Sequence, residues 1–159
     1  MTARRWRLAV GSDIAGLDYK ELIFADLLAD ERVASVKDLG VPAAAPESES
    51  YGQVGIRLAE LVAAGEIDRG VLVCGTGIGM AISANKVPGV RATVAHDSFS
   101  AERSILSNDC QVLALGQRVI GPELARRLVK EWLGYEFDST SASSEKVAVI
   151  TEYEERPAS

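Results

Sequence analysis

Histidine and cysteine are scarce in this chain, which has one His and two Cys among its 159 residues. A metal site usually gathers several such ligands at short spacing, and Cys74, His96 and Cys110 form no cluster of this kind. We therefore expect no metal site. Two distant cysteines also make no disulfide framework, which favours a reducing, cytoplasmic location.

The chain also lacks basic clusters and long apolar runs. Its formal net charge is −6, and no Lys/Arg cluster is longer than Arg4-Arg5 or Arg126-Arg127, which argues against nucleic-acid binding. The apolar run after the basic start stops at Gly11, too early for a signal-peptide core or a membrane span. An anionic small molecule remains a reasonable ligand, because a local pocket can be positive on an acidic protein.

What is present is an ordinary globular composition, with 47% hydrophobic and 25% charged residues. The length suits a single α/β domain over residues 1–159. Apolar runs predict strands at 7–13, 33–39, 70–74, 91–96 and 111–115. Helical spacing predicts helices at 17–28, 51–64, 80–85, 98–107 and 122–133, and a C-terminal helix at about 144–154. This alternation predicts a parallel sheet of about five strands, covered by helices on both faces.

Ligands of such sheets bind beyond the carboxyl ends of the strands, so residues that end strands are the first candidates. The run Cys74-Gly75-Thr76-Gly77-Ile78-Gly79 follows the clearest buried strand and opens a helix, where its backbone N–H groups could bind an anion. It lacks the Gly-Lys-Ser/Thr of a Walker loop and the third glycine of a dinucleotide fingerprint. A tight turn beside a buried cysteine is the alternative.

Cys74 and His96 could carry chemistry. A thiol at a helix N-terminus ionises more readily, and its thiolate can act as a nucleophile or as a base. His96 ends a strand; it could pair with Cys74 or donate a proton, or it could simply cap the sheet edge or the next helix. Cys110 lies among ordinary strand residues and is expected in the core.

Charged residues at other element ends could bind a substrate. Asp13 closes the first strand and suits a hydroxyl contact or a catalytic role, or it caps the next helix. Arg118 follows the last strand, and Lys146 opens the final helix. Either cation could hold a phosphate or could be a solvated surface charge.

Five segments carry a further signal: 11–16 (GSDIAG), 68–80 (DRGVLVCGTGIGM), 84–92 (ANKVPGVRA), 107–109 (SND) and 112–119 (VLALGQRV). Together they resemble the family of type B ribose-5-phosphate isomerases and galactose-6-phosphate isomerase subunits, over nearly the whole chain. The resemblance implies a Rossmann-like three-layer α/β/α sandwich and a sugar-phosphate isomerase that needs no metal or cofactor. It also implies a homodimer or homotetramer whose active sites are shared between subunits.

The resemblance assigns roles to individual residues. Cys74 matches the catalytic base, and Thr76 matches a residue that assists proton transfer near the substrate oxygens. The loop glycines Gly75, Gly77 and Gly79 match backbone donors that stabilise an enediolate, as an oxyanion hole does. The remaining matches are substrate contacts, to hydroxyls from Asp13 and Asn108 and to the phosphate from Arg118.

The chain departs from the family pattern at several of these positions. The family usually has histidine at Ile14 and Ser107, and the second histidine opens the furanose ring as a general acid. Residues 50–52 (SYG) replace Asp-Tyr-Pro, and Ala142 and Lys146 stand near the places of two phosphate-binding arginines. Further candidate contacts are Ser12, Tyr51, His96 and Ser107.

These departures bear on the substrate. A pentose 5-phosphate closes into a furanose that must be opened, whereas a tetrose 4-phosphate has no free hydroxyl with which to form that ring. The chain is therefore expected to interconvert D-erythrulose 4-phosphate and D-erythrose 4-phosphate. Ribose 5-phosphate and ribulose 5-phosphate are the alternative pair, since Ser107 or water could replace the acid. A noncatalytic sugar-phosphate-binding subunit is an alternative of another class, against which the retained Cys74 argues.

Overall fold

The computed structural model describes residues 4–41 and 48–157. Within these ranges one sheet holds five parallel strands, as the sequence predicted, and their order is β2-β1-β3-β5-β4. The strands are β1 (Trp6–Ser12), β2 (Val33–Asp38), β3 (Arg69–Cys74), β4 (Ala92–Val94) and β5 (Val112–Gly116). The domain expected over 1–159 also includes residues 1–3, 42–47 and 158–159, which lie outside the described residues.

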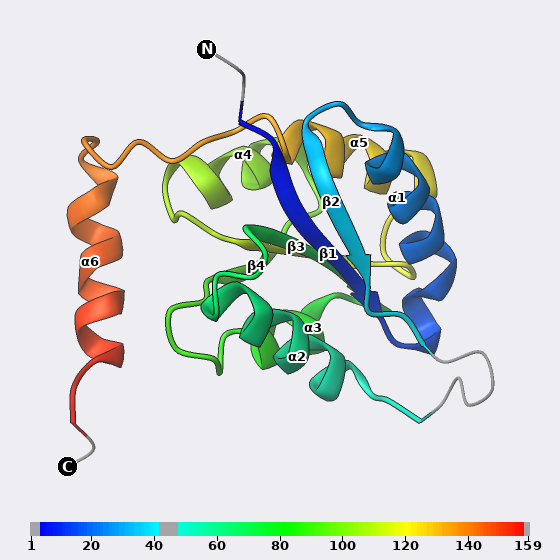
Figure 1. Cartoon of the computed structure of the whole chain (residues 1–159), viewed down its shortest axis with the longest axis horizontal. Helices are drawn as coiled ribbons and strands as arrows, with labels where there is room; N and C mark the ends of the chain where they lie inside the picture. Colours follow the sequence, from blue (N-terminus) through cyan, green and yellow to red (C-terminus); the bar gives the residue numbers. More distant parts are fainter. Residues whose placement is uncertain (1–3, 42–47, 158–159) are drawn as a thin grey trace.

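Helices cover both faces of the sheet (Figure 1). They are α1 (Leu17–Ala29), α2 (Tyr51–Ala63), α3 (Ile78–Ala84), α4 (Ser98–Leu106), α5 (Pro122–Trp132) and α6 (Ser143–Glu154). Residues of α1, α4 and α5 form one buried cluster with the strands, and residues of α2 and α3 form a second. This arrangement is the predicted Rossmann-like three-layer α/β/α sandwich. Within the described ranges, no helix has the length and apolar character that a membrane span requires.

Alternation along β3 decides which cluster each side chain joins. All of β3 is buried, because β1 and β5 flank it in the centre of the sheet. Val71 and Val73 pack with the residues of α1, α4 and α5, whereas Leu72 and Cys74 pack with those of α2 and α3. Cys74 therefore ends the central strand on the face that α2 and α3 cover.

The edge strand β4 is shorter than the sequence predicted. A strand was expected at 91–96, but β4 contains only Ala92–Val94 and pairs with β5 alone. The Asn85 side chain hydrogen-bonds to both the backbone N–H and the backbone C=O of Ala92, at 2.8 Å each, which anchors the start of the strand. Since the ladder stops at the pair Val94 and Ala114, the last residues of β5 have no strand neighbour on that side.

The C-terminal helix α6 stands beside the body of the molecule, at the end of a long connection after α5 (Figure 1). It occupies Ser143–Glu154, where a helix was expected at about 144–154. Val147 is buried, but Val149, Ile150 and Tyr153 expose 63%, 42% and 71% of their surface. A group of exposed apolar side chains on an outlying helix is typical of a contact with another protein.

Candidate active site

The carboxyl ends of the strands meet at one edge of the sheet, because all the strands are parallel. β1 ends just before Asp13, β3 ends at Cys74, and β5 ends two residues before Arg118. Each helix that connects two parallel strands begins at this same edge, so Tyr51 at the start of α2 also lies there. The fold thus gathers these four sequence-predicted candidates at one edge.

The loop after β3 surrounds the Cys74 thiol. Cys74 is 4% exposed, and its Sγ atom accepts a hydrogen bond from the backbone N–H of Gly77 at 3.1 Å. Gly77 has a φ of 81°, in the left-handed region, and a Cβ there would lie 3.0 Å from the carbonyl carbon of Leu115. Only glycine meets both conditions, so Gly77 fixes the path of the loop around the sulfur.

Thr76 and Gly79 complete the loop. The Thr76 side chain is exposed, and its Oγ1 accepts a hydrogen bond from the Ile78 N–H at 3.2 Å. The ring of Tyr51 covers Gly79 so closely that a Cβ on this glycine would lie 2.5 Å from the Tyr51 Cδ2 atom. Tyr51 remains 49% exposed. The loop is therefore flanked by an aromatic wall and presents a hydroxyl to solvent.

Arg118 is tied to the same loop through its backbone. The Gln117 N–H donates to the Cys74 carbonyl at 2.9 Å, and the Arg118 N–H donates to the Gly75 carbonyl at 3.0 Å. The Arg118 guanidinium lies over Gly75, with Nη1 3.3 Å from where a Cβ of that glycine would be. No carboxylate of the described residues pairs with this guanidinium, so it is available to an anion.

Asp13 and its neighbours form the β1 side of the edge. One oxygen of Asp13 accepts the Ala15 N–H at 3.0 Å and caps a short 3-10 helix, Ile14–Gly16. Asp13 is thus a cap, as one reading of the sequence predicted, while its second oxygen accepts no hydrogen bond from the described residues. Ser12 is fully buried, and its hydroxyl has no hydrogen-bond partner among the residues that the structure describes. The Ile14 side chain is 48% exposed and offers no donor.

His96 bonds to β5 rather than to Cys74. Its Nε2 atom accepts a hydrogen bond from the Gly116 N–H at 2.9 Å. Burial lowers the pKa of His96 below its ordinary value, while the neighbouring Asp97 carboxylate opposes this effect. Among the described residues no hydrogen bond joins His96 to Cys74, and no group of three or more His, Cys, Asp or Glu could hold a metal ion.

Three other candidates lie away from this edge. Helix α4 carries the chain back across the sheet, so Ser107 and Asn108 follow it at the amino edge of β5. Asn108 lines a cavity of about 570 Å³ together with Cys110 and residues of α6. Lys146 is exposed on α6 itself. These residues do not share a site with Cys74 within one chain.

Cys110 is a core residue, as the sequence predicted. It is 7% exposed, and burial raises the pKa of its thiol to about 11. A thiol in this state stays protonated near neutral pH. Cys110 is therefore unsuited to acid–base chemistry.

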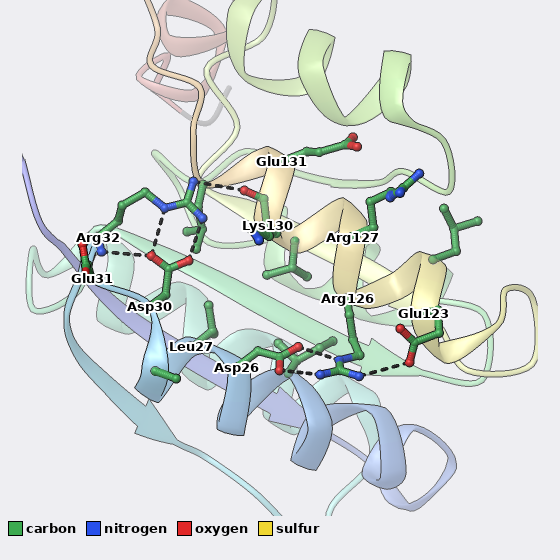
Figure 2. A pocket seen from close by; sticks show the side chains of 15 residues that line it. Asp26, Leu27, Asp30, Glu31, Arg32, Glu123, Arg126, Arg127, Lys130 and Glu131 are labelled. Atoms are coloured by element: carbon green, nitrogen blue, oxygen red, sulfur yellow. Dashed lines mark hydrogen bonds and ion pairs between the residues drawn. The ribbon is translucent and has the colours of Figure 1, made fainter.

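A larger groove of about 1260 Å³ lies between α1 and α5 and contains none of the candidate residues (Figure 2). Figure 2 shows Arg126 between Asp26 and Glu123, at 2.7 and 3.0 Å. Arg32 pairs with Asp30 at 2.6 Å in the same groove. Arg126 and Arg32 are thus paired with carboxylates, whereas Arg127 and Lys130 of the same groove form no ion pair among the described residues. The groove is not assigned as the site, because it contains none of the candidate residues.

Sequence reasoning gave no role to Gly16 and Gln117, which shape the site. A Cβ on Gly16 would lie 2.3 Å from the Val73 carbonyl oxygen, so this glycine lets the segment after β1 approach β3. The Gln117 side chain accepts the Tyr19 N–H and donates to Asp18, both at 3.1 Å. Gly16 belonged to a segment that carried the resemblance, which was a usable signal. The partners of Gln117 are distant in sequence, and no local pattern indicates them.

Comparisons with known proteins agree with this fold. The family model described as ribose/galactose isomerase matches residues 8–150. D-erythrulose-4-phosphate isomerase 2 of Mycolicibacterium smegmatis is 56% identical over 148 residues, covering 93% of this chain and 97% of that protein. Ribose-5-phosphate isomerase B of Escherichia coli is 40% identical over 150 residues, covering 94% and 97%.

A solved structure from the same family has a similar fold. That of Clostridium thermocellum ribose-5-phosphate isomerase B superposes with a TM-score of 0.84 at 41% identity, covering 93% of this chain and 97% of that one. The family model and these relatives each match most of the chain, and they match the segments that carried the resemblance. The chain therefore belongs to the ribose/galactose isomerase family.

Proposed function

We propose that this chain interconverts D-erythrulose 4-phosphate and D-erythrose 4-phosphate, with Cys74 as the base. The observation that carries the proposal is the Cys74 thiol, held by the Gly77 N–H beside the unpaired Arg118 guanidinium. The 56% identity to a D-erythrulose-4-phosphate isomerase supports the tetrose substrate.

The chemistry follows from this arrangement. The Cys74 thiolate takes the proton from the carbon beside the carbonyl, and the electron pair of that C–H bond forms an enediolate. The thiol then returns the proton to the neighbouring carbon, while a second proton moves between the two oxygens with help from the Thr76 hydroxyl. The Gly77 N–H donates a hydrogen bond to the sulfur and holds it in place, and backbone N–H groups of the loop can stabilise the enediolate charge.

The pocket wall favours a short, open-chain sugar. Ile14 offers no hydrogen-bond donor at the carboxyl edge, and Ser107, which would reach the site only from a second copy, stands where the resemblance has the ring-opening histidine. A tetrose 4-phosphate forms no such ring and requires neither group. Ribose 5-phosphate is the second candidate, supported by the 40% identity to a ribose-5-phosphate isomerase B.

We further propose that a second copy of the chain completes each site. Asn108 and Lys146 are matched to substrate contacts but lie away from Cys74 in the same chain. Apolar side chains stand exposed near the carboxyl edge, as expected of a surface that a partner covers. They are Ile14, Ile78, Ile82, Phe99 and Val119. A homodimer would bring Asn108 and Lys146 of one copy to Cys74 of the other.

A substrate panel tests the activity. The purified chain alone is assayed with tetrose, pentose and hexose phosphates, and product formation is read by chromatography. The tetrose 4-phosphates are expected to give the highest kcat/KM. No turnover of any sugar phosphate would support the noncatalytic subunit instead, and faster turnover of ribose 5-phosphate would support the pentose reading.

Subunit mixing tests the shared site. C74A and N108A are each expected to be inactive or weak alone. After unfolding and refolding of an equal mixture, half of the dimers contain both chains, and each of these has one intact site, so about a quarter of the wild-type rate should return. If both residues serve the same site within one chain, the mixture gains nothing.

A further inference from the structure

We propose that His96 is a positioning residue for the isomerase reaction, which holds the carboxyl end of β5 in place by accepting a hydrogen bond from Gly116. Only the kinetic test of this proposal depends on the isomerase activity proposed above. It concerns a long-range contact between the end of β4 and the end of β5, and it assigns His96 no contact with substrate.

The short edge strand creates the need for this contact. β4 ends at Val94, which pairs with Ala114, whereas β3 continues on the other side of β5 to the pair Cys74 and Gly116. The Gly116 N–H therefore points beyond the last β4 residue. The His96 Nε2 atom accepts it at 2.9 Å and replaces the missing strand carbonyl.

Gly116 transmits its position to the reacting groups. A Cβ on Gly116 would lie 2.7 Å from the Cα of Thr76, so the two backbones are in direct contact. The next two residues donate their N–H groups to the carbonyls of Cys74 and Gly75, at 2.9 and 3.0 Å. A shift of Gly116 would therefore move the Arg118 guanidinium and the loop that holds the Cys74 thiol.

The contact requires a neutral imidazole, because a protonated Nε2 is itself a donor and cannot accept the Gly116 N–H. Burial lowers the pKa of His96, which keeps the ring neutral at pH 7. Among the described residues, the charged group that acts on the ring is the Asp97 carboxylate, just before α4. The Asp97 carboxylate accepts the Ser100 N–H at 2.7 Å and opposes the effect of burial. Lowering the pH until His96 is protonated should therefore break the hydrogen bond between its Nε2 atom and the Gly116 N–H.

Nuclear magnetic resonance tests the contact without any substrate. The Gly116 amide signal of the wild-type protein is expected to titrate together with the His96 ring below neutral pH. In H96Q, whose side-chain oxygen can accept the same hydrogen bond, that titration should disappear. If the chemical shift of the Gly116 amide does not change while the His96 ring titrates, the proposal is wrong, whichever sugar the enzyme uses.

Kinetics on the best substrate of the wild-type protein tests the consequence. H96L should lower kcat/KM about tenfold at neutral pH, the usual effect of one lost buried hydrogen bond. H96Q should recover most of this loss, and its acid limb should lack the ionisation that the wild-type protein shows. Only the difference between the two profiles is assigned to His96.

Two kinetic outcomes contradict the proposal. H96Q as impaired as H96L would make His96 a proton donor, and an unchanged H96L would remove it from the site. Circular dichroism checks that both variants fold. If H96L does not fold, the pH profile of kcat/KM for H96Q still decides the question. If the amide titration is found but no sugar phosphate is isomerised, the function fails while the positioning role of His96 stands.

Discussion

The Sγ atom of Cys74 lies 3.1 Å from the backbone nitrogen of Gly77 and accepts its hydrogen bond. This contact places a donor next to the one thiol at the carboxyl edge, where a negative charge on sulfur is stabilised. It depends on the left-handed backbone of Gly77, with φ of 81°. The residue that performs the proposed proton transfer and the residue that shapes its loop are therefore coupled.

Replacing the thiol should nearly abolish turnover. C74A removes the base, and a positioned base contributes roughly 10²–10⁴-fold to the rate. We expect kcat to fall by this factor while folding and sugar-phosphate binding persist, as measured by steady-state kinetics and calorimetry. C110A is the matched control, since the pKa of Cys110 is raised to about 11 and its thiol stays protonated. Near-normal activity of C74A would refute the mechanism.

Replacing Gly77 should lower kcat, because the loop that holds the Cys74 sulfur would move. An alanine at Gly77 costs about 1–2 kcal/mol for its positive φ, and its Cβ would also press on the Leu115 backbone at 3.0 Å. G65A is the control, because Gly65 has a φ of 71° but open space around it. Both variants should lose stability to urea, and only G77A should lose kcat. Equal kcat values in G77A and G65A would show that Gly77 has no specific role in the reaction.

Much of the fold follows from local pattern. The apolar runs that stop at Gly or Asp mark β1 and β3, and strand–helix alternation predicts a parallel sheet. That topology alone places Asp13, Cys74 and Arg118 at one edge. The length of β4 was not predictable, because it depends on the hydrogen bonds between Asn85 and Ala92.

The rest of the site is not local. Asn108 follows a helix that returns to the amino edge, so one chain cannot bring it to Cys74, although the resemblance assigned both to one substrate. The resemblance also implies sites shared between subunits, which would let Asn108 of one copy reach Cys74 of another. The bond between His96 and Gly116 joins residues that are twenty positions apart and has no sequence signature.

Removing the charge of Arg118 should weaken the use of phosphorylated sugars. A charge-assisted hydrogen bond to an anion is worth about 1.5–3 kcal/mol, so R118M should lower kcat/KM roughly 10–150-fold. K146M should have the same direction of effect if Lys146 reaches the phosphate from the partner copy. R127M is the control, since Arg127 is an exposed cation on α5. Unchanged kcat/KM in R118M and K146M would remove both residues from the site.

Arg69 should be the most costly arginine to replace for stability. It is 6% exposed, its guanidinium carbon lies 3.8 Å from the Trp6 ring centre, and it donates hydrogen bonds to the carbonyls of Trp132 and Tyr135. R69M removes both hydrogen bonds. The Trp132 carbonyl still accepts the Tyr135 N–H at 3.3 Å, but the Tyr135 carbonyl loses the Arg69 donor, at a cost of about 1–3 kcal/mol in the free energy of unfolding. Urea denaturation measures it. R4M is the control: Arg4 also stacks on Trp6, at 4.2 Å, but its side chain is 57% exposed and should contribute less than about 1 kcal/mol.

Restoring histidine should shift the substrate preference. Ile14 and Ser107 stand where relatives in the resemblance carry histidine, and an unpaired buried substrate hydroxyl costs about 1–3 kcal/mol, roughly 5–150-fold in kcat/KM. The wild-type chain should therefore prefer tetrose 4-phosphates to ribose 5-phosphate by a factor in this range. Ser107 lies at the amino edge, so S107H would act on the site of the partner copy. S107H, alone or with I14H, should raise kcat/KM for ribose 5-phosphate more than for the tetrose, because only the pentose must be opened from a ring.

The control for this prediction adds a histidine at a position that is matched to no substrate contact. Leu28 is 64% exposed near the end of α1, so L28H carries the same new side chain without access to the site. It should leave the ratio of the two kcat/KM values unchanged. If the wild-type chain already turns over ribose 5-phosphate faster than the tetrose, the absence of a ring-opening acid does not select the substrate. The groups at Ile14 and Ser107 then lose their role in specificity, while the proton transfer at Cys74 is unaffected.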